Sequence, residues 1–302
     1  MSVKIRKAVF PAAGMGTRFL PATKVMPKEM LTVVDKPIIQ YGVEEAIASG
    51  CDEIIIVTGR GKVLMEDHFD ISFELEHSLA KRNKKSLLET AQQVARMAHV
   101  STVRQKEPLG LGHAVLMAKR LVGDEPFGVI LPDDLVDSPD YPCLKQLIDV
   151  FDEKQASVIA TQIVEGKAIS AYGVLDARPV DGFNGRLYEI RDMVEKPKFE
   201  EAPSKLAIIG RYVLTPRIFE MIEQTTPGAG GELQLTDALR NLLRHEKIYG
   251  YVFEGKRHDA GDKLGFLKAT VEYALQHEEL GEEFKKYLLG LDIERASRGP
   301  LC

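Results

Sequence analysis

Two closely spaced glycines, Gly14 and Gly16, lie in the segment 12–18, directly after the short apolar run 8–10. Glycine has no side chain, so the backbone amides of such a loop can approach an anion closely. The apolar run predicts a buried strand, and α/β folds bind ligands where strands end. We therefore expect a phosphate-binding loop that includes Ala12, Ala13, Gly14 and Gly16.

Three families of nucleotide-binding proteins use glycine-rich loops in this way, and the neighbouring residues separate them. The dinucleotide fingerprint of dehydrogenases has a third glycine three residues after Gly16, where this chain has Phe19. The P-loop of kinases and ATPases has four residues between its glycines and then Lys-Ser or Lys-Thr, which this segment lacks. Both of these families are disfavoured.

Positive side chains follow the glycines. Arg18 ends the segment, and Lys24 and Lys28 come after it in a stretch interrupted by prolines. A guanidinium can bind two phosphate oxygens at once, and an ammonium is a compact charge that can neutralise a transferring phosphoryl group. The combination predicts a triphosphate site in which Arg18 and Lys28 are catalytic.

Two adjacent carboxylates, Asp133 and Asp134, follow the apolar run 129–131. Mg²⁺ prefers hard oxygen ligands, and a carboxylate at the end of a buried strand is placed to supply one. Neighbouring side chains of an extended chain point to opposite sides, so only one of the two should bind the ion. We predict that Asp133 is this magnesium ligand.

Gln105 follows the expected strand 100–104, and its amide offers both a donor and an acceptor, as pairing with the imide edge of uracil or thymine requires. Taken alone, a glutamine at a strand end is most often a surface residue. Gly110 and Gly112 would let the backbone pass close to a base, or they form a plain loop before a helix. The residues themselves leave these alternatives open.

The elements that must position these residues are predicted by short β-branched runs that alternate with longer amphipathic segments. Expected strands cover 8–10, 53–58, 100–104, 127–131, 157–163, 172–176, 187–195, 207–213 and 248–253, and expected helices cover 38–49, 114–121, 144–151, 236–243 and 263–277. A flexible loop is expected at 227–231. The pattern predicts a Rossmann-like α/β fold with a mixed, mainly parallel sheet flanked by helices.

The composition limits the partners of the protein. The chain has 302 residues, with 40 Lys and Arg against 45 Asp and Glu and a net charge of −5, so nucleic acid and anionic membranes are not expected partners. Cys51, Cys143 and Cys302 are widely spaced, which predicts neither a disulfide framework nor a zinc site. No signal peptide and no apolar stretch of ~20 residues is evident. We expect a cytoplasmic protein that acts on small molecules.

Several segments of the chain, including those that carry the residues discussed above, closely resemble the bacterial UTP–glucose-1-phosphate uridylyltransferases. These enzymes, also called UDP-glucose pyrophosphorylases, belong to the sugar nucleotidyltransferases. The matching blocks are 12–30, 35–41, 110–114, 131–134, 171–174, 195–197, 210–212, 231–237 and 258–261, in the order of the family. The resemblance covers nearly the whole chain. Thr32 departs from it, because relatives often have proline there, and the tail after about Glu278 is generic.

The resemblance implies a reaction and further site residues. A phosphate oxygen of α-D-glucose 1-phosphate would attack the α-phosphorus of UTP in line, with Mg²⁺, to give UDP-glucose and pyrophosphate. The substrate supplies its own nucleophile, so catalysis would depend on positioning and charge neutralisation. By resemblance, Asp259 is the second metal ligand, Gln105, Gly110 and Gly112 contact the nucleotide, Gly173 and Glu195 contact the sugar, and Lys196 is a catalytic residue that binds its phosphate.

We expect one domain in which residues 1–165 mainly bind the nucleotide, 166–262 mainly bind the sugar phosphate and 263–302 form a C-terminal helical region. The resemblance also implies a dimer or tetramer and a role in polysaccharide biosynthesis. The nearest alternative is the same chemistry with dTTP, another nucleotide or another sugar. A second alternative is a regulatory protein that binds a nucleotide sugar without turnover, but the retained charged residues argue against it. A third alternative is a dehydrogenase.

Overall fold

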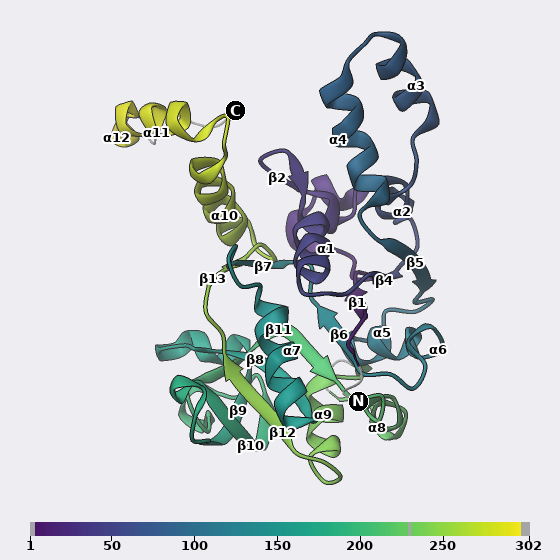
Figure 1. Ribbon diagram of the computed structural model, residues 1–302. Helices are drawn as coiled ribbons and strands as arrows, with labels where there is room; N and C mark the ends of the chain where they lie inside the picture. The colour runs from purple at the N-terminus through teal and green to yellow at the C-terminus, as the bar shows by residue number, and fades with distance from the viewer. Residues whose placement is uncertain (1–3, 229–230, 297–302) are drawn as a thin grey trace.

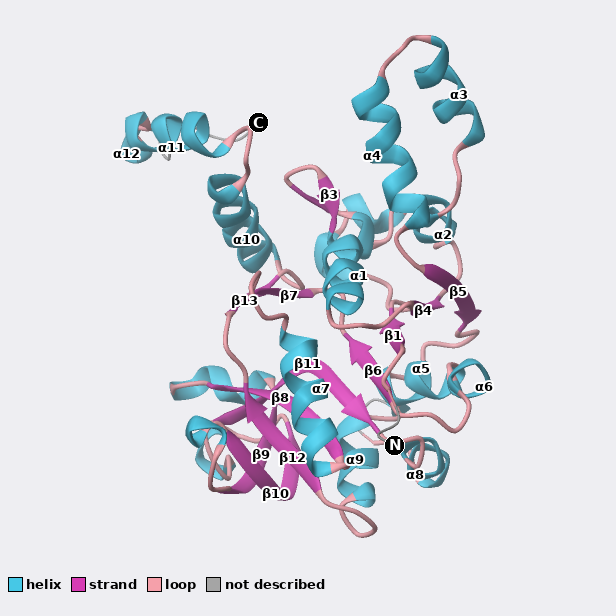
Figure 2. Ribbon diagram, viewed as in Figure 1, coloured by secondary structure: helices cyan, strands magenta, loops and turns pink. Residues whose placement is uncertain are grey.

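The computed structural model describes residues 4–228 and 231–296. Within that part of the chain, a nine-stranded sheet has the order β5-β4-β1-β6-β11-β8-β12-β10-β9 (Figures 1 and 2). Its strands are β1 (Lys7–Pro11), β4 (Glu53–Thr58), β5 (His99–Arg104), β6 (Phe127–Ile130), β8 (Ser157–Ile163), β9 (Gly173–Pro179), β10 (Leu187–Glu195), β11 (Leu206–Leu214) and β12 (Ile248–Val252).

The sheet is mixed. β5, β4, β1 and β6 run parallel to one another, and β12 runs parallel to β8. β11 is antiparallel to β6 and β8, and β10 is antiparallel to β12 and β9. The predicted α/β fold with a mixed sheet is confirmed, with parallel pairing concentrated in the first half of the chain.

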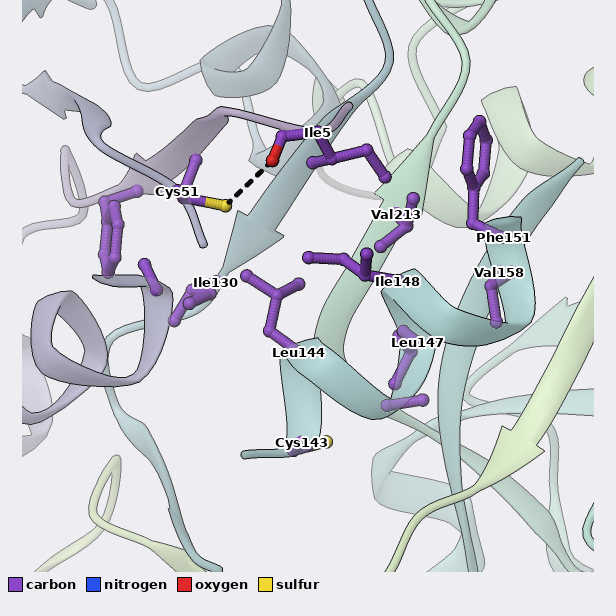
Figure 3. Close-up of a cluster of buried hydrophobic side chains, with 14 of the residues drawn as sticks. Ile5, Cys51, Ile130, Cys143, Leu144, Leu147, Ile148, Phe151, Val158 and Val213 are labelled. Atoms are coloured by element: carbon purple, nitrogen blue, oxygen red, sulfur yellow. Dashed lines mark hydrogen bonds between the residues drawn. The ribbon is translucent and has the colours of Figure 1, made fainter. Parts of the chain in front are cut away.

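Helices cover both faces of the sheet. Alternate residues of β1 point to opposite faces, so Ala8 and Phe10 belong to one apolar cluster and Val9 to the other. The first cluster includes residues of α1 (Ile38–Ala48) and α7 (Cys143–Lys154), and the second includes residues of α5 (Leu111–Met117), α8 (Ile218–Gln224) and α9 (Leu235–Leu242). Figure 3 shows side chains of α7 packed in the first cluster, where each fully buried Leu or Ile contributes roughly 1.5–3 kcal/mol.

The predicted strands are all present with small shifts at their ends. The helix expected at 114–121 is divided in two, because α5 ends at Met117 and α6 (Lys119–Val122) begins after Ala118. Helix α10 (Lys263–Gln276) matches the expectation closely. In the loop expected at 227–231, residues 229 and 230 lie outside the described part of the chain.

Several elements were not expected. They are α2 (Val63–Phe69), α3 (Phe73–Lys81), α4 (Lys85–Arg96) and two short strand pairs, β2 (Thr32–Val33) with β3 (Lys36–Pro37) and β7 (Asp134–Asp137) with β13 (Lys256–Asp259). Helices α11 (Gly281–Gly290) and α12 (Ile293–Ala296) lie in the C-terminal region that was expected to be helical, although their bounds were not predicted. Helices α3 and α4 form a hairpin that projects from the body of the molecule, and α11 and α12 extend on the other side (Figure 1). No helix of the described residues is long and apolar enough to span a bilayer.

Candidate active site

The segment 12–18, called the glycine-rich loop below, leaves β1 at the edge of the sheet where four parallel strands end. The amide of Ala12 donates to Val57 O at 2.9 Å, which anchors the start of the loop to β4. Gly16 has a φ of 66°, a left-handed conformation that favours glycine. Among the described residues, the amides of Ala13 and Gly14 have no hydrogen-bond acceptor. These two N–H groups are therefore available to an anion.

Asp133 lies just beyond β6, and the two predicted catalytic cations lie beside it. Lys28 Nζ is 2.5 Å from Asp133 Oδ2, and Arg18 Nη1 donates to Gly261 O at 3.4 Å. Burial opposes ionisation of Asp133, but the charge and hydrogen bond of Lys28, with help from Arg18, keep the pKa of this carboxyl below its usual value. The sequence predicted a phosphate as the partner of Lys28, whereas in this structure Lys28 is paired with the carboxylate of Asp133.

The two predicted metal ligands face the same small space. Ala260 N donates to Asp133 O at 2.8 Å, which ties the end of β13 to the Asp133 loop. A methyl group at Gly261 would lie 2.9 Å from Asp133 Oδ2 and 3.0 Å from Asp259 Oδ1, so the missing side chain leaves a gap between the two carboxylates. No group of three or more His, Cys, Asp or Glu in the described chain forms a metal cage. In this structure Asp133 Oδ2 is paired with Lys28, and Asp259 accepts from Gly261 N at 3.0 Å and from Arg257. Two neighbouring carboxylates fit Mg²⁺, which is commonly held by one or two carboxylates, waters and substrate phosphates.

Asp134 begins β7 and binds other partners than Asp133 does. The backbone between them is not extended, because Asp134 N donates to Leu131 O at 3.2 Å and closes a turn, so a turn and not strand alternation separates the two carboxylates. Asp134 accepts hydrogen bonds from Gly210 N at 3.0 Å and from Arg257 Nε at 2.7 Å. Burial raises the pKa of Asp134, while the charge of Arg257 opposes that shift. Arg257 also donates to Asp259 Oδ2 at 3.1 Å, so it holds the second predicted metal ligand in place.

Gln105 lines a cavity of about 370 Å³ together with Ala13, Gly14, Met15 and residues 59–62, called the loop cavity below. Its side chain is buried, and its Nε2 donates to Gly110 O at 3.2 Å and lies 2.9 Å from His113 Nδ1. Within the described chain its carbonyl oxygen accepts no hydrogen bond. Gln105 can therefore accept from the imide N–H that uracil and thymine share.

Gly110 and Gly112 allow a close approach to another part of the chain. A methyl group at Gly110 would lie 2.9 Å from Leu233 O, and one at Gly112 would lie 2.8 Å from it. Gly112 N donates to Leu233 O at 2.8 Å, and Leu233 N donates to Leu109 O at 2.7 Å. In this structure the backbone that fills the space above both glycines is that of Leu233, and a contact of either glycine with a base stays a prediction.

Glu195 and Gly173 line a second cavity of about 210 Å³, called the Glu195 cavity below, whose wall also includes Arg18, Asp133 and Asp259. Thr236 Oγ1 donates to Glu195 Oε2 at 2.7 Å, which fixes the carboxylate. A methyl group at Gly173 would lie 3.2 Å from that oxygen, so glycine keeps the space open. The cavity contains carboxylate oxygens that can accept hydrogen bonds from hydroxyl groups.

Lys196 lies outside the wall of the Glu195 cavity. Its side chain is 61% exposed and its Nζ is 3.5 Å from Glu195 Oε1. Its φ of 46° lies in the left-handed region, which is uncommon for a residue with a side chain and is often retained at functional sites. Of the predicted site residues, Ala13, Gly14 and Gln105 line the loop cavity, and Arg18, Asp133, Gly173, Glu195 and Asp259 line the Glu195 cavity. The others line neither cavity: Ala12, Gly16, Lys28, Gly110, Gly112 and Lys196.

Sequence reasoning missed several residues that support the site. Arg257 and Thr236 hold Asp134, Asp259 and Glu195, as described above. Arg211 on β11 donates to Leu131 O at 3.2 Å and Asp134 O at 2.6 Å, which fixes the loop that carries Asp133. Both arginines lie in or beside blocks that carry the family resemblance, but their partners are far away in the sequence, so spacing alone gave no signal.

The glycine-rich loop borders both cavities, because Gly14 and Met15 line the loop cavity and Arg18 lines the Glu195 cavity. A nucleotide in one and an anionic acceptor in the other would meet beside Asp133. Group transfer between two phosphates needs orientation and charge neutralisation, not a protein nucleophile. The fold and this site define a nucleotidyl-transferring enzyme.

Comparison with known proteins gives the same class. The family model for nucleotidyl transferases matches residues 7–276. A UTP–glucose-1-phosphate uridylyltransferase of Staphylococcus epidermidis is 52% identical over 290 residues, which cover 96% of this chain and 99% of that protein. A UDP-glucose pyrophosphorylase solved with UDP-glucose is 47% identical with a TM-score of 0.81, over 91% of this chain and all of that one. A UTP-bound enzyme from Acinetobacter baumannii is 43% identical with a TM-score of 0.89, over 96% of this chain and all of that one.

The chain therefore belongs to the nucleotidyl transferase family. The resemblance to the bacterial UTP–glucose-1-phosphate uridylyltransferases is confirmed, because about half of the residues of this chain are identical in these relatives over nearly its full length.

Proposed function

We propose that this protein transfers the uridylyl group of UTP to α-D-glucose 1-phosphate, with UDP-glucose and pyrophosphate as products. The observation that supports the proposal is that the glycine-rich loop borders both cavities, so two substrates bound in them would lie side by side near Arg18 and Asp133. The choice of substrates is supported by the names of the relatives, one of which is described with UDP-glucose and another with UTP.

In this proposal the sugar phosphate oxygen attacks the α-phosphorus of UTP in line with the departing pyrophosphate. The free amides of Ala13 and Gly14 orient the nucleotide, and Arg18 and Lys28 neutralise phosphate oxygens. Outside the loop, Gln105 accepts from the base, Glu195 accepts from sugar hydroxyls and Lys196 binds the sugar phosphate. Mg²⁺ held by Asp133 and Asp259 would supply further neutralisation of phosphate charge.

Pyrophosphate release tests the substrate choice. Purified protein is incubated with Mg²⁺, glucose 1-phosphate and UTP, dTTP, ATP, CTP or GTP in turn, and UTP is then paired with other sugar 1-phosphates. We expect UTP with glucose 1-phosphate to give the highest kcat/KM. A clear preference for dTTP would assign thymidylyl transfer instead, and binding of UDP-glucose without any turnover would favour the regulatory protein.

The gap at Gly261 provides a test of the metal site. Gly261→Ala fills the space between Asp133 and Asp259, and Asp133→Asn removes a carboxylate charge, so both should reduce Mg²⁺-dependent turnover at least ~100-fold. Gly290→Ala is the control, because a methyl group there meets nothing within 4 Å. Thermal unfolding checks that the variants are folded. Full activity of the wild type in excess EDTA would contradict a metal requirement.

The proposal includes a cytoplasmic homo-oligomer that supplies UDP-glucose for polysaccharide biosynthesis. Oligomerisation is supported by large apolar side chains that are exposed on the C-terminal helices, among them Leu264, Leu267, Tyr287 and Leu289. Light scattering on purified protein tests it, and a monomer at micromolar concentration would contradict it.

A further inference from the structure

A buried lysine lies directly beneath the glycine-rich loop. Lys62 follows β4 and is 7% exposed, and its Nζ contacts both Glu29 Oε2, at 2.8 Å, and the carbonyl oxygen of Ala12. Glu29 is 1% exposed and adjoins the predicted catalytic residue Lys28. The function proposed above assigns no task to the Lys62–Glu29 pair.

Stability alone is a weak explanation for this pair. Taking two charges out of water is costly, and replacing a buried ion pair with uncharged residues is often neutral for stability. Burial lowers the pKa of Lys62, against the charge of Glu29. The second carboxylate oxygen of Glu29 is buried and accepts no hydrogen bond among the described residues. The pair is thus incompletely satisfied, although it is surrounded by protein.

The contact with Ala12 has a geometric consequence. In a planar trans peptide, the C=O and the following N–H point in opposite directions. The Lys62 ammonium holds the Ala12 carbonyl on its own side of the loop, so the Ala13 amide points to the other side. That amide has no acceptor among the described residues, and Ala13 lines the loop cavity. A methyl group at Gly59 would lie 2.9 Å from Ala13 O, so the segment 59–62 packs tightly against the loop.

We propose that Lys62 is a positioning residue that fixes the Ala12–Ala13 peptide plane and thereby aims the Ala13 amide at the bound nucleotide, with Glu29 as its counter-ion. This inference rests on nucleotide binding in the loop cavity, as proposed above. Without the ammonium, the peptide can rotate and the amide is no longer preorganised, so the nucleotide must order the loop when it binds.

The test separates this role from folding. Lys62→Met removes the ammonium but leaves Glu29 buried and unpaired, so its melting temperature should fall. The double variant Lys62→Met with Glu29→Gln removes both charges and should recover most of that loss. Binding of UTP with Mg²⁺, without glucose 1-phosphate, is measured by calorimetry at a temperature well below each transition. We expect the Kd for UTP to rise about 10-fold or more in both variants, as for the loss of a hydrogen bond to a charged group.

Steady-state kinetics adds a second readout, because a purely structural role of Lys62 would not change the KM for UTP and the KM for glucose 1-phosphate differently. The KM for UTP should rise in the double variant, while the KM for glucose 1-phosphate stays near the wild-type value. Lys7→Met is the matched control, because Lys7 is also largely buried, donates to a backbone carbonyl, Val122 O at 2.9 Å, and pairs with a glutamate away from the loop. It should leave the Kd for UTP unchanged.

Each outcome decides one question. A stable double variant that binds UTP as the wild type does would overturn the role of Lys62. An equal rise of Kd in Lys7→Met would show a general loss of stability and would also overturn it. Failure of the wild type to bind UTP would instead reject the proposed function, because that result does not depend on Lys62.

Discussion

Lys196 illustrates how much a single residue can contribute without being buried. Its exposed ammonium contributes little to folding, since an ion pair with Glu195 at the surface is worth at most about 1 kcal/mol. The left-handed backbone conformation of Lys196 nevertheless costs energy, and the fold retains this conformation at the end of β10. In the function proposed above, this exposed cation next to Glu195 binds the substrate and does not serve stability.

We expect Lys196→Ala to lower kcat/KM at least ~100-fold, because it removes a charge that neutralises the sugar phosphate. The melting temperature should stay within a few degrees, since the side chain is largely exposed. Lys198→Ala is the control, because Lys198 is two residues away and pairs with Glu201 at the surface. Near-normal turnover of Lys196→Ala would remove this residue from the mechanism.

At the scale of single residues, the sequence could predict the position of a residue where strand order was informative, while the role of that residue stays a prediction. Asp133 and Gln105 follow strands of the parallel part of the sheet, so their arrival at one edge could be predicted. Arg257 and Lys62 could not be assigned, because their importance depends on Asp134 and Ala12, which are distant in the sequence. A pattern within a segment carries no information about such partners.

At the scale of elements, β11 connects the core of the sheet to the loop that carries the predicted metal ligand Asp133. Arg211 is fully buried on β11 and binds Glu45 of α1, with Nη2 2.7 Å from Oε2. The same guanidinium donates to the carbonyls of Leu131 and Asp134 on either side of Asp133. One side chain thus joins a strand, a helix and the loop of the predicted metal ligand.

Arg211→Met should reduce the free energy of unfolding by about 3–5 kcal/mol, because it leaves the buried charge of Glu45 without its counter-ion. Urea denaturation followed by circular dichroism measures this change. Adding Glu45→Gln to Arg211→Met should restore part of the loss, since the unpaired charge is then gone. A loss below about 1 kcal/mol would mean that water replaces the guanidinium.

The elements that the sequence predicted share one property, which is a buried apolar run or a strongly amphipathic segment. β4 and β11 are nearly continuous apolar strands, and β4 was placed without error at its ends. The pair β7 and β13 was missed because its residues, Asp-Leu-Val-Asp and Lys-Arg-His-Asp, are mostly polar. Polar strands of this kind are held by partners such as Arg257, so hydrophobic patterning does not reveal them.

At the scale of the whole molecule, two apolar clusters on opposite faces of one sheet support both cavities. The sheet runs from β5 beside the loop cavity to β9 beside the Glu195 cavity, so the nucleotide and sugar halves share their core. The predicted boundary at residue 165 therefore falls within one continuous sheet, and the division of binding roles stays a prediction. Opening of this core should expose groups from distant parts of the chain together.

Two cysteines can report that opening. Cys51 and Cys143 are free, fully buried and members of the same apolar cluster (Figure 3). Burial raises the pKa of the Cys51 thiol to about 12 and raises that of Cys143 well above its usual value, so neither forms a reactive thiolate at neutral pH in the native state. Both should react with a thiol reagent only from opened molecules, and therefore at the same slow rate.

Mass spectrometry of the Cys302→Ser variant, which leaves Cys51 and Cys143 as the reporters, measures the labelling rates. UTP with Mg²⁺ binds the native state alone, so at 100 times its Kd it should add about 2.7 kcal/mol to the free energy of unfolding and slow the labelling of both thiols about 100-fold, provided that opening is reversible and faster than labelling. Labelling of Cys51 long before Cys143 would show that the cluster opens in parts. Equal labelling with and without nucleotide would show that the exposing motion leaves the nucleotide site intact.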